Sequence, residues 1–249
     1  MLKVSALKAA VGGREILHGL DLELRAGETV VLLGKNGAGK STLAKALMRG
    51  EWEDKRDYQE KAASTKKSLT IAGKIKFEGR DISNWSTEQR ARAGMFLAAQ
   101  QPVEVVGVST TELLKASLEA RDGKKWQIED VQKELALAAK KIAVNIFTAE
   151  RELNVGFSGG EKKKNEILQM MVLKPKFAVL DEPDSGLDFQ STKRISQALA
   201  DFQKETNIGY LIISHNLKIL EKLPVAKVYL LEEGRIVQEG GEELLWREG

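Results

Sequence analysis

The stretch Thr29–Met48, TVVLLGKNGAGKSTLAKALM, decides the fold. It contains a short apolar run, a glycine-rich loop that fits the pattern GxxxxGK[ST], and a helical run. An apolar run without polar alternation is typical of a strand buried on both faces of a parallel sheet. The backbone N–H groups of such a loop wrap phosphates, and the following helix points its positive end at them. We therefore expect a phosphate site at the carboxyl end of a buried strand.

The residue types of this loop suit a nucleotide with its metal ion. Lys40 is expected to pair with the β- and γ-phosphates, and the Ser41 hydroxyl to bind Mg²⁺. The predicted nucleotide-binding residues here are Gly34, Lys35, Asn36, Gly37, Ala38, Gly39, Lys40, Ser41 and Thr42.

Other apolar runs extend this unit into an α/β sheet. Residues 95–98, 177–180 and 210–213 are short, apolar and next to helical stretches, which predicts a mostly parallel sheet. Leucines at 20, 22 and 24 alternate with acidic residues and predict an antiparallel sheet at the N-terminus. Residues 227–237 have the pattern of a hairpin.

The middle of the chain has helical periodicity instead. One apolar stripe contains Leu113, Leu114, Ser117 and Leu118, and a second contains Ile128, Val131, Leu135 and Ile142. We expect a single domain over 1–249, in which 1–100 and 174–249 form the nucleotide-binding α/β core with its antiparallel β-subdomain and 101–173 form a helical subdomain. The charged segment 51–68 is predicted to be a solvated loop or short exposed helix.

Composition excludes some functions. The 249 residues contain 39 basic and 36 acidic side chains, a surplus too small to argue for nucleic-acid binding. There is no cysteine, so the chain has no disulfide and no thiolate with which to hold an iron–sulfur cluster. No apolar run has the length of a signal peptide core or membrane span, so we expect a cytoplasmic protein without direct membrane insertion.

Two carboxylates end the apolar run at 177–180. Asp181 is expected to hold Mg²⁺ and Glu182 to polarise the attacking water in nucleotide hydrolysis. In isolation, the same pattern also fits a strand followed by an acidic surface turn.

A second anion-binding helix start occurs at Phe157–Glu161, FSGGE. A hydroxyl and two glycines expose backbone N–H groups at the positive end of a helix. The phosphate loop already provides one helix start for the γ-phosphate, so a second anion-binding helix start in the same chain should serve a different nucleotide molecule. This predicts a dimer in which each chain contributes to two sites. A simple helix cap explains the same residues in isolation.

Six motifs together resemble the ATPase domain of ATP-binding cassette (ABC) proteins. They are GKNGAGKST, Gln100, FSGGE, FAVLDE, SGLD at 185–188, and His215 after a buried strand. The resemblance implies a P-loop NTPase fold with a RecA-like core, and ATP and Mg²⁺ as cofactors. It also implies a homodimer that closes head to tail around ATP.

The resemblance assigns roles to single residues as well. Lys40 and Ser41 of one subunit would share a nucleotide with Ser158, Gly159 and Gly160 of the other. Glu182 would be the general base, and His215 would contact the γ-phosphate. Gln100 and Asp181 would bind the metal together with Ser41. Asp188 would signal across the interface.

Three segments resemble the SufC family, the ATPases of SUF iron–sulfur cluster assembly. They are NVGFSGGEKKKNEILQM at 154–170, DSGLD at 184–188 and QQPVEVVGVS at 100–109. The implied partners are soluble scaffold proteins of the SufB/SufD type. Pro183 departs from this resemblance and favours a membrane transporter subunit as the alternative. A DNA-repair or ribosome-associated ATPase is a third reading, which a lobe too short for a coiled-coil arm opposes.

The three lysines at 162–164 have three possible roles. They could face solvent, bind the scaffold, or hold Glu182 away from the water in an idle state.

Overall fold

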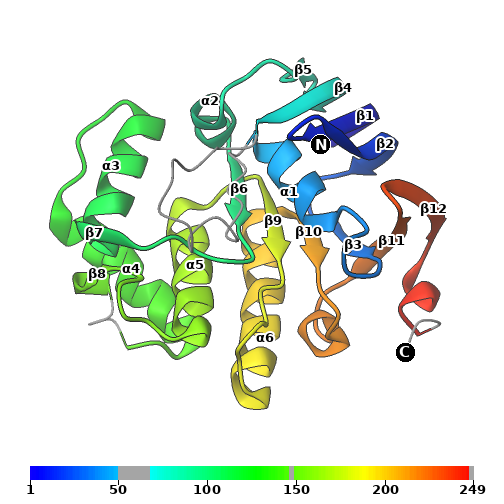
Figure 1. Cartoon of the computed structure of the whole chain (residues 1–249). Coiled ribbons are helices and arrows are strands. Elements are labelled where there is room, and N and C mark those ends of the chain that lie inside the picture. The colour runs from blue at the N-terminus through cyan, green and yellow to red at the C-terminus, as the bar shows by residue number, and fades with distance from the viewer. Residues whose placement is uncertain (50–67, 146–148, 247–249) are drawn as a thin grey trace, which may run out of the picture.

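The computed structural model describes residues 1–49, 68–145 and 149–246. Its centre is a six-stranded sheet (Figure 1). In spatial order the strands are β12 (Arg235–Gly240), β11 (Val225–Glu232), β3 (Thr29–Leu33), β10 (Gly209–Ile213), β9 (Phe177–Asp181) and β6 (Met95–Ala98). All neighbours are parallel except the β11–β12 hairpin. Every residue of β3, β9 and β10 is buried, as a strand covered on both faces requires.

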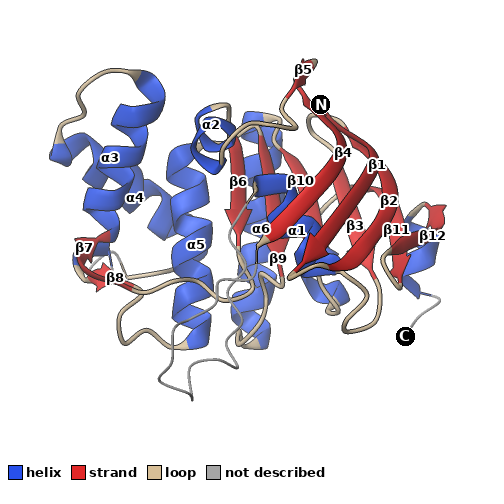
Figure 2. Ribbon diagram, turned by 45° about the horizontal axis from the view of Figure 1, so that its top comes forward, coloured by secondary structure: helices blue, strands red, loops and turns tan. Residues whose placement is uncertain are grey.

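A second, antiparallel sheet packs over one face of this sheet. Its order is β2 (Arg14–Leu24), β1 (Leu2–Val11), β4 (Leu69–Phe77) and β5 (Arg80–Asp81). Helix α1 (Lys40–Met48) lies between the two sheets (Figure 2), and its apolar side chains share one buried cluster with β1, β2 and β3. The phosphate loop that precedes α1 is thus anchored by packing on both sides.

Helices cover the opposite face. Val31, Ala178 and Tyr210 point to this face and share a cluster with α5 (Gly159–Leu173) and α6 (Phe189–Thr206). Helices α3 (Thr110–Asp122) and α4 (Ile128–Ile142) pack on α5, beside the short pair β7 (Val105–Ser109) and β8 (Glu152–Leu153). The other helical elements are α2 (Thr87–Arg92), η3 (Leu217–Leu220) and η4 (Glu242–Trp246).

The expected strands and helices are confirmed, but one residue of the second apolar stripe, on α4, is not buried. The antiparallel N-terminal sheet, the parallel strands, the two helices and the hairpin form where the sequence predicts them. Ile128, however, is 41% exposed, because it is the first residue of α4 and lies beyond the buried part of its stripe. The charged segment 51–68 lies outside the described residues except for Ser68.

Arg90 joins the phosphate-loop helix to the rest of the core. Its guanidinium is fully buried and donates hydrogen bonds to the carbonyls of Ala46, Leu47, Ile82 and Ser83, at 2.9, 2.6, 2.9 and 3.1 Å. The first two carbonyls belong to the last turn of α1, where helical acceptors lack i+4 donors, and the Ala46 carbonyl also accepts from the Arg49 N–H at 3.2 Å. Burial lowers the pKa of Arg90 to about 10, so the side chain stays charged at neutral pH.

We expect Arg90→Met to destabilise the domain by about 3 kcal/mol, because buried carbonyl acceptors lose their donor. Arg92 on the same helix is half-exposed and pairs with the exposed Glu88, so Arg92→Met should change stability by less than about 0.5 kcal/mol. Urea unfolding followed by circular dichroism measures both. Equal effects of the two variants would contradict the anchoring role of Arg90.

Candidate nucleotide site at the carboxyl ends of the strands

The phosphate loop connects β3 to α1, and its glycines are required by close packing. Gly34 has φ 146°, and a Cβ there would lie 2.2 Å from the Leu231 carbonyl oxygen. Gly39 has φ 109° at the N-cap of α1, and its Cβ would lie 2.8 Å from a Leu17 methyl group. No other residue type fits either position without moving the neighbouring strand or side chain.

The remaining loop residues divide into an exposed tip and a buried base. Lys35, Asn36 and Gly37 are exposed, whereas Ala38, Lys40 and Thr42 are buried and Ser41 is half-buried. The tip is therefore open to a ligand, and the base is fixed by the core.

Lys40 closes the loop on itself. Its ammonium donates to the carbonyls of Gly34 and, at 3.1 Å, Lys35. Burial lowers the pKa of Lys40, and the nearby carboxylates of Glu182 and Asp181 oppose that shift. The cation is thus held inside the loop, where phosphate oxygens can replace the carbonyls as its partners.

Asp181 has the environment of a metal ligand. It is the last residue of β9 and is 3% exposed. Burial raises the pKa of its carboxyl, and a hydrogen bond with the Ser41 side chain opposes the rise. Its Oδ1 atom is buried without a hydrogen-bond partner. An unpartnered carboxylate oxygen beside a hydroxyl suits Mg²⁺, which prefers oxygen ligands.

Glu182 and Gln100 are brought together, as the resemblance implies. Gln100 Nε2 donates to Glu182 Oε2 at 3.1 Å, although the two residues follow different strands, β6 and β9. Glu182 has φ 51°, a conformation that non-glycine residues seldom adopt, and its N–H bonds the Ile213 carbonyl at 2.8 Å. The backbone of the two adjacent strands therefore fixes where the Glu182 side chain begins.

His215 is exposed just beyond β10. The residue before it, Ser214, is buried and donates to Asp184 Oδ1 at 2.8 Å. Ser214 also accepts a hydrogen bond from Asn216 N–H at 3.0 Å. The bond between Ser214 and Asp184, for which no local sequence pattern gives a signal, ties the His215 loop to the turn that follows Glu182.

The second anion-binding end begins α5. Ser158 is its N-cap, and Ser158 and Glu161 exchange the reciprocal hydrogen bonds of a capping box. Gly159 is exposed and Gly160 is half-buried. A Cβ on Gly160 would lie 2.6 Å from the Gly186 carbonyl, so the start of α5 touches the backbone of the SGLD turn.

Asp188, at the end of that turn, caps a helix in this chain. Its carboxylate accepts hydrogen bonds from Ser191 N–H at 2.7 Å and Ser191 Oγ at 3.2 Å, at the start of α6. The Ser191 N–H is the main reason why the pKa of Asp188 is lowered.

The lysines after the SGG turn do not hold Glu182 in this conformation of the described chain. Lys162 pairs with Glu104. Lys163 is 3% exposed and donates to the carbonyls of Ala99 and Asp181, at 2.7 and 2.8 Å. The hydrogen-bond partner of Glu182 is Gln100 instead.

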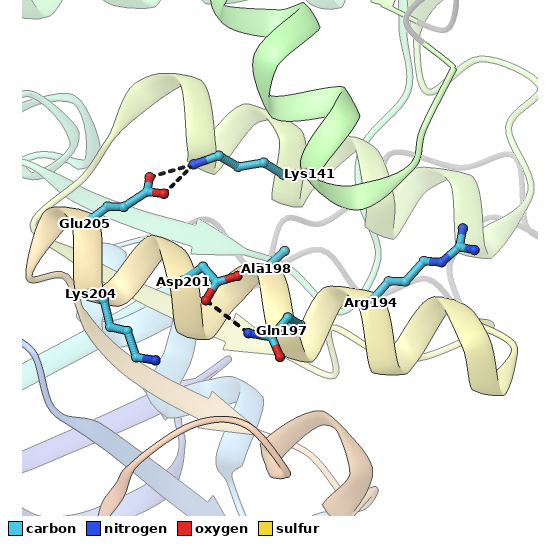
Figure 3. A pocket seen from close by; sticks show the side chains of 7 residues that line it. All are labelled: Lys141, Arg194, Gln197, Ala198, Asp201, Lys204 and Glu205. Carbon is cyan, nitrogen blue, oxygen red and sulfur yellow. Dashed lines mark hydrogen bonds and ion pairs between the residues drawn. The ribbon is translucent and has the colours of Figure 1, made fainter.

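A groove of about 450 Å³ between α4 and α6 lies apart from these residues (Figure 3). Two pairs of its polar side chains bond each other: Lys141 Nζ lies 2.8 Å from Glu205 Oε1, and Gln197 Nε2 lies 3.0 Å from Asp201 Oδ1. It contains none of the predicted site residues, so it does not compete with the phosphate loop as the nucleotide site.

Within residues 1–49, 68–145 and 149–246, no helix has the length and apolar character to cross a membrane.

The fold and the site define an ATPase of the ATP-binding cassette class, and comparison with known proteins agrees. The model of the ABC transporter family matches residues 17–185, so the chain belongs to this family. It is 37% identical over 248 residues to vegetative protein 296 of Bacillus subtilis, covering 99% of this chain and 89% of that protein.

Two further comparisons indicate the breadth of the family. The iron–sulfur cluster assembly protein SufC of Plasmodium falciparum is 37% identical over 238 residues, which span 94% of this chain and 64% of that protein. The dimeric structure of MJ0796, a bacterial ABC transporter cassette, superposes with a TM-score of 0.79 at 17% identity, covering 97% of this chain and 98% of that one.

The contact between α5 and the SGLD turn can be tested at its glycines. Gly160→Ala should destabilise the nucleotide-free domain by about 1–3 kcal/mol, because the added methyl group meets the Gly186 carbonyl. Gly159→Ala is the matched control, since nothing lies within 4 Å of its Cβ. Urea unfolding compares the two, and a Gly160→Ala variant as stable as Gly159→Ala would rule out the close contact.

Proposed function

We propose that two copies of this chain close around ATP and Mg²⁺, and that hydrolysis takes place between them. One observation carries this proposal. Gln100, Asp181 and Glu182 are gathered beside the phosphate loop, whereas the SGG turn begins a different helix, α5. A loop that binds phosphate and a second anion-binding helix end suit opposite sides of one nucleotide.

Each residue has a role that follows from its position. Lys40 and the loop N–H groups from 34 to 42 would bind the β- and γ-phosphates. Ser41, Asp181 and Gln100 would hold Mg²⁺, which neutralises charge on the phosphates. Glu182 would accept a hydrogen bond from the attacking water, oriented by Gln100, and His215 would donate to the γ-phosphate.

Ser158, Gly159 and Gly160 of the second copy would complete the site. The Ser158 hydroxyl serves the capping box in this structure, and it can turn to the γ-phosphate while its carbonyl continues to accept the first helical hydrogen bond. Asp188 would lie next to this contact, at the end of the turn that touches Gly160.

We expect Glu182→Gln to lower the ATPase rate by about 10²- to 10⁴-fold, because the amide cannot act as a base. ATP binding should persist, so size-exclusion chromatography with ATP and Mg²⁺ should show a dimer. Glu104→Gln is a control that changes an exposed carboxylate which pairs with Lys162. If Glu182→Gln hydrolyses ATP at the normal rate, the role of Glu182 is wrong.

We further propose that the ATPase drives conformational change in a soluble scaffold of the SufB/SufD type during iron–sulfur cluster assembly. The likeness to the Plasmodium SufC supports this partner. The structure adds a physical reason why the SufC-like residues occur together. Asn165 of α5 bonds Asn154 Oδ1 at 2.9 Å, and Asn154 bonds the Val103 carbonyl at 2.8 Å.

This buried amide chain connects α5 to the segment 100–109, where Val103 and Val106 are 69% and 76% exposed. These exposed valines lie three and six residues after Gln100 and offer apolar area to a partner. A movement of that partner would thus displace the segment 100–109, which contains Gln100 and is hydrogen-bonded to α5 through Asn154 and Asn165. The competing proposal is a membrane transporter subunit, which Pro183 after the acidic pair favours.

Val106→Asp should abolish co-purification of the partner while leaving the ATPase rate without partner unchanged. Leu137→Asp is the matched control, because Leu137 is a 62% exposed apolar side chain on α4. Mass spectrometry of the co-purified protein distinguishes the proposals: soluble SufB/SufD-type proteins support the first, and an integral membrane protein supports transport.

A further inference from the structure

Helix α5 carries a buried lysine–glutamate pair that the mechanism above does not use. Lys163 and Glu166 are 3% and 7% exposed and lie on the face of α5 that packs against the sheet. Lys163 Nζ lies 3.9 Å from Glu166 Oε2. The pair is thus close enough for charge attraction but longer than a hydrogen bond.

The two side chains bind both backbone polar groups of one residue, Ala99, which directly follows β6. Lys163 donates to the Ala99 carbonyl at 2.7 Å. Glu166 Oε1 accepts from Ala99 N–H at 3.0 Å. The residue that follows is Gln100, the hydrogen-bond partner of Glu182.

The contact from Ala99 to Glu166 does not depend on the ionisation of the carboxyl. Burial raises the pKa of Glu166 to about 8, and Lys163 opposes this rise. A carboxylate and a neutral carboxylic acid both offer an oxygen acceptor to an N–H group. The Ala99 N–H therefore keeps its acceptor in either state.

Stability alone does not account for these charged residues. Burial of an ionisable pair returns little net stability, and well-packed apolar side chains often stabilise such a site equally. Glu166 Oε2 is moreover buried without a hydrogen-bond partner. The position of Ala99 is what the pair supplies beyond an apolar core.

We propose that Glu166, supported by Lys163, is a positioning residue that makes Gln100 follow the movement of α5. This inference rests on the proposed function, in which Gln100 orients the water and the metal. The SGG turn lies six residues before Glu166, about 9 Å along the helix. Each subunit would contact two nucleotides, one at its phosphate loop and one at the start of its α5. The nucleotide at the start of α5 would thereby fix the position of Gln100 beside the other nucleotide, at the phosphate loop of the same subunit.

The test uses one change that removes the acceptor and one that retains it. Glu166→Met keeps the volume but cannot accept from Ala99 N–H, whereas Glu166→Gln keeps an acceptor oxygen. We expect Glu166→Met to lower kcat about 10- to 100-fold with the KM for ATP within about twofold, because misplaced groups cost rate more than binding. Glu166→Gln should stay within about threefold of the wild type.

A double-mutant cycle separates positioning from general damage. In a Gln100→Ala background, Glu166→Met should lower kcat by less than about twofold, since the side chain that Glu166 positions is already absent. An equal loss in both backgrounds would overturn the inference. Gln169→Ala, a change on a half-buried position of α5, is the matched control.

Amide hydrogen exchange gives a readout that needs no ATPase activity. Glu166→Met should lower the protection of the Ala99 amide about tenfold while the amides of β3 keep theirs, because one hydrogen bond is lost locally. Unchanged protection of Ala99 overturns the inference even if the protein hydrolyses ATP. If the wild type does not hydrolyse ATP, the proposed function fails, and exchange at Ala99 alone decides this inference. Should Glu166→Met not fold, Glu166→Ala takes its place.

Discussion

The burial of ionisable side chains at the carboxyl ends of β3, β6 and β9 is the constraint on which the rest of this structure depends. Lys40, Asp181, Lys163 and Glu166 all lie in this small region and are all less than 8% exposed. Ions in such surroundings must be paired or hydrogen-bonded, because water no longer screens them. The carbonyls of Gly34, Ala99 and Asp181 supply that compensation to the two lysines. The same few main-chain carbonyls therefore stabilise the buried lysines and fix the backbone from which the candidate site residues extend.

The β-sheet core could be predicted almost residue by residue. Strands buried on both faces are continuous apolar runs, and β3 and β6 begin and end where those runs do. The helix cap at Ser158 could also be predicted, because the cap and its partner Glu161 lie three residues apart. By contrast, β8 has only two residues, Glu152 and Leu153, which is too short for a pattern.

Contacts between distant segments of the site could not be predicted from local sequence patterns. The sequence associates Gln100 with Glu182 only through the family resemblance, since 82 residues separate them. No local sequence pattern predicts the hydrogen bond from Ser214 to Asp184. Lys163 shows a different failure, because three consecutive lysines suggest a solvated face. Its spacing from Ile167 and Met170, both buried, could have placed it on the inner face of α5.

The contact of Gly160 with Gly186 has a thermodynamic consequence for a pair of such subunits. Gly186 lies four residues after Glu182, and Gly160 belongs to the helix end that would bind the other subunit's nucleotide. If nucleotide binding at one site changes the free energy of this contact, then a change in the contact alters the free energy of nucleotide binding by the same amount. Each subunit would therefore report the state of its own nucleotide to its neighbour with the same strength with which it receives the neighbour's. Two sites linked in this way cannot titrate independently, so ATP binding to the pair should be cooperative in one sign or the other.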